Sequence, residues 1–70
     1  MRLGLIGLGR IGGFHANTLS GLPAVDCLVV YDPATALVDA AVERLGAERA
    51  SSLDALINSG VDGIVIAAPM

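Results

Sequence analysis

The chain has 70 residues, of which 54% are hydrophobic and 16% charged, and its formal net charge is −3. Its four basic residues are arginines spread along the chain, so we expect neither nucleic acid nor an anionic membrane as a partner. No apolar run is long enough to span a bilayer, and the single cysteine, Cys27, has no second cysteine to pair with, so we expect a cytoplasmic protein.

The first feature along the chain is an apolar strand followed by a glycine-rich turn. Gly7, Gly9 and Gly12 have the G-x-G-x-x-G spacing of dinucleotide-binding loops. In such loops the first glycine allows a sharp turn, the second lets the backbone approach a pyrophosphate, and the third lets the next helix pack closely on the strand. The helix N-terminus also favours an anion. The spacing alone is weak evidence, because a glycine-rich turn without a ligand has the same pattern.

The turn is followed by a segment with helical periodicity. Ile11, Phe14 and Leu19 recur at intervals that place them on one face, which predicts a helix from about Arg10 to Ser20. Gly21 and Pro23 are expected to end it. His15 falls in this helix, where it is either an ordinary packed or partly exposed residue or a contact to a ligand near the turn.

A second strand is predicted for the β-branched run from Val25 to Tyr31, in which we expect Cys27 to be a small buried residue. Asp32 follows this strand, about twenty positions beyond the last glycine of the motif, where a dinucleotide fold places the acid that binds the adenosine ribose. A carboxylate there favours a free 2′-hydroxyl over a 2′-phosphate, so NAD is expected rather than NADP. A simpler interpretation is that Asp32 caps the next helix, with Pro33 as the first helical residue, and both roles are compatible.

The rest of the chain continues to alternate between helices and strands. The expected elements are a helix over 34–45 ended by Gly46, a short edge strand over 47–50, a helix over 53–58 and a buried strand over 63–68 stopped by Pro69. Ser51 or Ser52 is expected to cap the third helix, with Asp54 placed for a capping box with Ser51. We expect the last strand to be an open apolar edge that promotes self-association of the chain.

Alternation of this kind predicts an α/β fold with a doubly wound parallel sheet of the Rossmann type, in the strand order 3-2-1-4. Ligands bind such sheets where the strand order reverses, which here lies between the first and the last strand. The glycine turn, Asp32 and the end of the last strand would then meet at one cleft suited to a dinucleotide.

The motif Gly7-Leu8-Gly9-Arg10-Ile11-Gly12 with His15-Ala16, together with the later run over 61–69, resembles the glucose–fructose oxidoreductase/inositol dehydrogenase/MocA (Gfo/Idh/MocA) family along essentially the whole chain. The resemblance implies an NAD(P)-dependent oxidoreductase that transfers a hydride from a sugar, a polyol or an inositol-like alcohol and is a homo-oligomer. It also implies that the cofactor contacts the residues Gly7, Gly9, Arg10, Ile11, Gly12, Asp32, Ala68 and Pro69.

The chain departs from the family pattern in its last residues and in its length. Ala68 stands where the family pattern has Ser or Thr, and Met70 stands where it has Thr. The family's Glu-Lys-Pro motif with its catalytic lysine has no counterpart, since the sequence contains no lysine. We therefore assign no catalytic residue and no metal ligand. Residues 1–70 are expected to be the N-terminal portion of an NAD(P)-binding domain truncated after its fourth strand, inactive without the rest of that domain and the substrate domain.

Three other functions share features with this sequence. A β-hydroxyacid dehydrogenase has a similar glycine loop, although His15 and the strand over 61–64 argue against it. A flavin-binding fold usually has a glutamate where Asp32 stands. A non-catalytic NAD-sensing module would have the same loop and would lack the downstream Glu-Lys-Pro motif.

Overall fold

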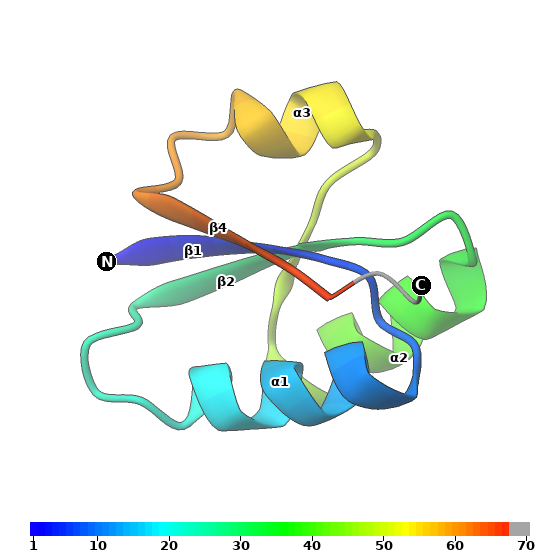
Figure 1. Cartoon of the computed structure of the whole chain (residues 1–70), viewed down its shortest axis with the longest axis horizontal. Coiled ribbons are helices and arrows are strands. Elements are labelled where there is room, and N and C mark those ends of the chain that lie inside the picture. The colour runs from blue at the N-terminus through cyan, green and yellow to red at the C-terminus, as the bar shows by residue number, and fades with distance from the viewer. Residues whose placement is uncertain (68–70) are drawn as a thin grey trace.

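The computed structural model describes residues 1–67, with the side chains of residues 10–14 outside that description. Within this range the elements are β1 (Arg2–Ile6), α1 (Arg10–Ser20), β2 (Cys27–Tyr31), α2 (Thr35–Leu45), β3 (Glu48–Arg49), α3 (Leu53–Ile57) and β4 (Gly63–Ile66). The strands of the described part form one parallel sheet in the order β3-β2-β1-β4. Helices α1 and α2 cover one face and α3 the other (Figure 1). The predicted doubly wound sheet and its strand order are confirmed.

The larger part of the core lies between the sheet and the α1–α2 layer. Alternate residues of β1 and β2 point into this layer, and Leu5 and Val30 are completely buried. Ala16 of α1 and Val38 of α2 pack against them. Among the described side chains, Leu19 of α1 and Ala41, Val42 and Leu45 of α2 also belong to or pack against this core, whereas Leu37 is exposed.

On the opposite face, α3 packs directly on the backbone of β1. Leu56 is completely buried there with Val29 and Ala50. A Cβ atom added at Gly4 would lie 2.7 Å from Leu56 Cδ2 and 3.4 Å from Leu56 Cγ. A glycine inside a strand often marks such a close approach. Gly4 therefore makes room for the side chain that anchors α3.

We expect Gly4→Ala to lower the free energy of unfolding by about 1–3 kcal/mol, because the added methyl group overpacks a buried contact. Denaturant unfolding measures the change. Gly63→Ala is the matched control, since Gly63 is also a strand glycine but a Cβ there would lie 3.4 Å from Leu3 Cδ2, at the edge of ordinary van der Waals contact. If both variants lose the same free energy of unfolding, the contact with Leu56 is not the reason that position 4 requires glycine.

The structure corrects the predicted start of α2 and confirms one of the two caps predicted for α3. Helix α2 begins at Thr35 with Ala34 as its N-cap, so the prediction that Asp32 caps it with Pro33 as the first residue is wrong. Helix α3 is capped by Ser52, whose Oγ accepts a hydrogen bond from Ala55 N–H at 3.0 Å. The capping box expected between Ser51 and Asp54 is therefore not formed. At α2 the Asp32 carboxylate accepts the N–H of Ala34, one residue before the helix begins, and at α3 the second of two adjacent serines supplies the cap.

Strand β4 is not the buried strand that its apolar sequence predicts. Ile64 is 41% exposed and Ile66 is 71% exposed, because the short helix α3 packs over β1 and β2. Their register with Gly4 and Ile6 places both isoleucines on the α3 face of the sheet. The other edge strand, β3, has two residues and carries the exposed charges of Glu48 and Arg49. Charges protect an edge strand from pairing with another chain, and β4 has none.

We therefore predict that the chain self-associates through β4 and that Ile66→Lys reduces this association. A lysine at an exposed position of an edge strand disfavours strand pairing and costs little folding energy. Light scattering over a range of protein concentrations measures the effect. Ile57→Lys is the matched control, because Ile57 is 51% exposed but lies on α3 rather than on the strand edge. A parent chain that stays monomeric at high concentration would contradict the prediction.

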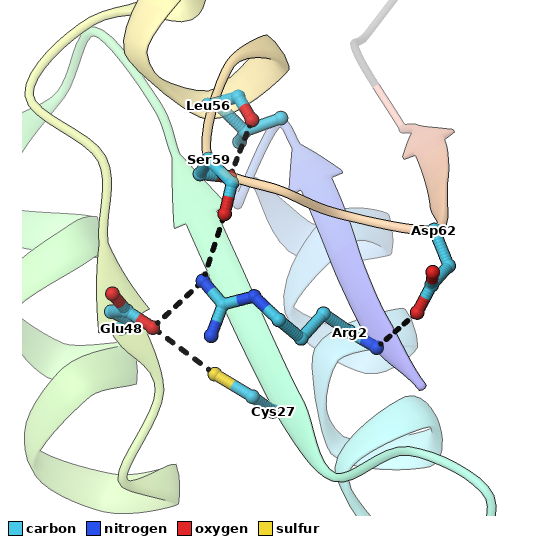
Figure 2. A network of polar contacts seen from close by, with 6 residues as sticks. All are labelled: Arg2, Cys27, Glu48, Leu56, Ser59 and Asp62. Carbon is cyan, nitrogen blue, oxygen red and sulfur yellow. Dashed lines mark hydrogen bonds and ion pairs between the residues drawn. The ribbon is translucent and has the colours of Figure 1, made fainter.

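A polar network joins the amino-terminal ends of the strands (Figure 2). Arg2 Nη2 lies 3.2 Å from Glu48 Oε2 and donates a hydrogen bond to Ser59 O at 3.2 Å. The Arg2 backbone N–H donates to Asp62 Oδ2 at 2.9 Å. The network thus links the start of β1 to β3 and to the segment that leads into β4. It lies at the end of the sheet opposite to the glycine turn.

Cys27 belongs to the same network and is half-buried rather than fully buried as predicted. Its Sγ–H donates a hydrogen bond to Glu48 Oε2 at 3.2 Å. Partial burial and this hydrogen bond raise the pKa of the Cys27 thiol, although the nearby Arg2 acts in the opposite direction. The hydrogen bond from Cys27, followed by the charge of Arg2, lowers the pKa of Glu48. The thiol is therefore protonated at neutral pH and acts as a hydrogen-bond donor.

Candidate functional site

The candidate site lies at the carboxyl end of the sheet, where β1 leads into the glycine turn. Gly7 has φ 97°, a left-handed conformation that only glycine adopts without strain. Its N–H donates a hydrogen bond to Tyr31 O at 2.9 Å, which ties the turn to the end of β2. The sharp turn predicted at Gly7 is therefore present, and its contact with a cofactor stays a prediction.

Gly9 is the N-cap of α1 and has an ordinary extended conformation, with φ −65° and ψ −164°. Apart from the neighbouring residues in the chain, a Cβ atom added there would meet no atom of the described structure within 4 Å. Neither the backbone conformation nor the packing of the described residues therefore requires glycine at this position. As the N-cap, Gly9 has no side chain that could accept hydrogen bonds from the first N–H groups of α1. Open space beside a backbone at a helix N-terminus suits the close approach of a phosphate group.

The carboxylate of Asp32 lies between the turns that follow β1 and β2. Its Oδ2 accepts a hydrogen bond from Leu8 N–H at 2.7 Å, and its Oδ1 accepts one from Ala34 N–H at 2.8 Å. Each carboxylate oxygen has a second lone pair, so the group can still accept hydrogen bonds from the hydroxyls of a ribose. Asp32 is only half-buried, which leaves it accessible to a ligand.

The end of β4 lies beside the same turn. Ala67 N–H donates a hydrogen bond to Ile6 O at 2.8 Å, so the chain leaving β4 runs next to the chain leaving β1. The strand order reverses between these two strands, and this is the place where open α/β sheets bind ligands. The structure thus brings together the glycine turn, Asp32 and the end of β4, as the sequence predicts.

Several predicted site residues cannot be placed in the same detail. Arg10, Ile11 and Gly12 lie in the first turns of α1, and their side chains and surroundings fall outside the described part of the structure. Ala68 and Pro69 lie beyond the described residues altogether. His15 is an exposed residue of α1 with an interaction partner of its own, and its contact with a ligand stays a prediction.

Leu8 is the site residue that sequence reasoning missed. Its side chain is 5% exposed and packs in the main core, while its N–H points to Asp32. The only feature of the sequence that points to this role of Leu8 is the position of an apolar residue between two glycines at the end of a strand. A turn that is flexible on both sides is thereby fixed at its centre.

The described residues contain no group of three His, Cys, Asp or Glu side chains that could hold a metal ion. In the same part of the chain, no helix has the length and the apolar character needed to cross a membrane. The described part of the site presents backbone N–H groups and the Asp32 carboxylate. An open glycine backbone at a helix N-terminus and an ordered carboxylate at the end of β2 fit a dinucleotide, which presents a pyrophosphate and a ribose.

Comparison with known proteins agrees with this geometry. The model of the family described as "Oxidoreductase family, NAD-binding Rossmann fold" (Gfo/Idh/MocA) matches residues 1–70. The scyllo-inositol 2-dehydrogenase (NAD(+)) of Bacillus subtilis is 31% identical over 72 residues, which cover 99% of this chain and 21% of that protein.

Two solved structures have the same fold. A Sinorhizobium meliloti protein assigned as a myo-inositol dehydrogenase has a TM-score of 0.87 and 34% identity, covering 99% of this chain and 21% of that one. GenD2 from gentamicin A biosynthesis, solved in complex with NAD, has a TM-score of 0.85 and 33% identity, covering 99% of this chain and 20% of that one. The chain thus spans about a fifth of the length of these relatives.

Proposed function

Since this chain belongs to the Gfo/Idh/MocA family of NAD-binding oxidoreductases, we propose that it holds the adenosine and pyrophosphate half of NAD for a dehydrogenase acting on a sugar, a polyol or an inositol-like alcohol. The observation that carries the proposal is the position of Asp32. Asp32 follows β2, and its carboxylate is hydrogen-bonded to the glycine turn. In this position it can also accept hydrogen bonds from the hydroxyls of the adenosine ribose.

Each part of the site has a role in this proposal. The backbone at Gly9 and the N-terminus of α1 bind the pyrophosphate, and Gly7 gives the turn its direction. Arg10, Ile11, Gly12, Ala68 and Pro69 complete the cofactor contacts by their likeness to the family. NAD, when bound, supplies the hydride acceptor for oxidation of an alcohol. The residues of this chain bind and orient it.

The proton acceptor lies outside these residues in our proposal. The sequence has no lysine, whereas the family's proton acceptor is a lysine. We propose that residues 1–70 are the N-terminal portion of a Rossmann cofactor domain, and that further polypeptide supplies the remaining strands, the catalytic residues and the substrate domain. The names of the inositol dehydrogenase relatives support an inositol-like substrate, and the family likeness supports a homo-oligomer.

Calorimetric titration of the chain with NAD and NADP tests the cofactor half of the proposal. Saturable binding that favours NAD supports it, and a folded chain that binds neither dinucleotide overturns it. The substrate half needs the full-length protein, assayed for NAD reduction with inositols, sugars and a panel of β-hydroxyacids. Turnover of hydroxyacids alone would assign a β-hydroxyacid dehydrogenase, and NAD binding without any turnover would assign a sensing module.

A further inference from the structure

We propose that Asp32 is also a positioning residue for the pyrophosphate half of the site, because it holds the glycine turn through the N–H of Leu8. The inference rests on the proposed function, since it assumes that NAD binds at this turn. It adds that recognition of the ribose and binding of the pyrophosphate depend on the same side chain. The group that recognises the ribose also maintains the backbone conformation that receives the phosphates.

The contacts of the turn carry the argument. Gly7 N–H is bound to Tyr31 O at 2.9 Å, and Leu8 N–H is bound to Asp32 Oδ2 at 2.7 Å. Two successive N–H groups of the turn are therefore tied to two successive residues at the end of β2. The first contact joins backbone to backbone and does not depend on the side chains of Tyr31 or Asp32. The second depends on one side chain, so a change at Asp32 reaches the turn directly.

A tether at Leu8 matters because the residues on both sides of it are glycines. Glycine has more accessible backbone conformations than any other residue, so an untethered G-x-G turn samples many arrangements. The buried Leu8 side chain fixes the turn on the core side, and the Asp32 carboxylate fixes its N–H. Ordering the turn before the ligand arrives reduces the cost of binding.

Asparagine cannot replace the carboxylate at this position. Both oxygens of Asp32 already accept a backbone N–H, from Leu8 on one side and from Ala34 on the other. An amide has one oxygen and one NH₂ group, so its NH₂ group would face one of the two backbone N–H groups, and two donors cannot form a hydrogen bond. Asp32→Asn therefore disturbs the turn even though the two side chains have nearly the same shape.

This positioning role and the charge of Asp32 predict opposite changes in phosphate affinity when the carboxylate is replaced. Removing a negative charge beside a phosphate site should strengthen phosphate binding if the carboxylate acts only through its charge. Loss of the tether should weaken it. A ligand without ribose hydroxyls separates the two effects, because it cannot make the direct contact with Asp32.

The first experiment compares the parent chain with Asp32→Asn by calorimetry, using ADP and 2′,3′-dideoxy-ADP as probes. We expect the variant to bind dideoxy-ADP roughly tenfold more weakly, the effect of losing one hydrogen bond to a charged group. Circular dichroism establishes that the variant is folded. Unchanged or tighter binding of dideoxy-ADP by the folded variant would overturn the inference.

The second experiment leaves Asp32 in place and removes single N–H donors. A chain of 70 residues is accessible to chemical synthesis, so the amide of Leu8 can be replaced by an ester. The same replacement at Ala34 is the matched control, because it deletes the other donor to Asp32 without touching the glycine turn. We expect the Leu8 ester to weaken NAD binding about tenfold and the Ala34 ester to change it less than about twofold.

The two experiments distinguish the inference from the proposed function. A parent chain that binds NAD, together with equal NAD affinities for the two esters, overturns the inference and leaves the function standing. A folded parent chain that binds neither NAD nor ADP overturns both.

Discussion

Gly9→Ala is expected to weaken NAD binding by more than about tenfold while changing the free energy of unfolding by less than about 1 kcal/mol. The added Cβ would point into space that no atom of the described structure occupies within 4 Å. If a pyrophosphate uses this space, the methyl group keeps it away from the backbone N–H groups of the turn. Calorimetric titration with NAD and denaturant unfolding measure the two quantities.

Folding should tolerate this substitution because its effects on stability oppose one another. Alanine is a poorer N-cap than glycine, which costs up to about 1 kcal/mol. It also reduces the conformational entropy of the unfolded chain, which stabilises the folded state by about 0.4–1 kcal/mol where the backbone conformation is allowed. The φ of −65° at Gly9 is allowed for any residue. A loss of NAD binding would therefore report on the site rather than on the fold.

Gly21→Ala is the matched control for this variant. Gly21 follows the other end of α1, has an ordinary φ of −87°, and a Cβ there would lie 3.6 Å from Thr18 O, an ordinary contact. It should leave NAD binding unchanged. Normal NAD affinity in Gly9→Ala would mean that the cofactor does not approach the turn at this glycine.

Elements that depend on local sequence were predictable from the sequence alone. Helix α1 runs from Arg10 to Ser20 as its apolar spacing and the following Gly21 indicate. Gly46 ends α2 in the left-handed conformation expected of a C-terminal glycine, with φ 68°. The strand order follows from the alternation of strands and helices, because right-handed crossovers leave few arrangements for such a chain.

Contacts between distant segments were not predictable in the same way. A glycine at position 4 signals close packing in a strand, but its partner Leu56 lies on a helix far along the chain. The apolar sequence of β4 suggests burial on both faces, yet the length and position of α3 decide that Ile66 is exposed. Likewise, the position of Asp32 after β2 predicts a contact with ribose but not the hydrogen bond to Leu8 N–H. Such contacts depend on register and on the angles between elements, which residue spacing does not specify.

The second large effect concerns cofactor choice, and we expect Asp32→Ala to lower the affinity for NAD roughly tenfold or more. The substitution removes the acceptor that we assign to the adenosine 2′-hydroxyl, and it also frees the N–H of Leu8 from its tether. The affinity for NADP should fall less, because in the parent chain the same carboxylate repels the 2′-phosphate of NADP. Parallel titrations with NAD and NADP measure both affinities.

The ratio of the two affinities is the informative quantity in this experiment. Release of the Leu8 N–H affects the pyrophosphate end, which NAD and NADP share, so its contribution cancels in the ratio. What remains is the difference between a hydroxyl and a phosphate at the 2′-position. A ratio that moves toward NADP therefore places the adenosine ribose at Asp32, whatever the effect on the turn. Equal losses for both cofactors would remove Asp32 from ribose recognition and leave it with the positioning role alone.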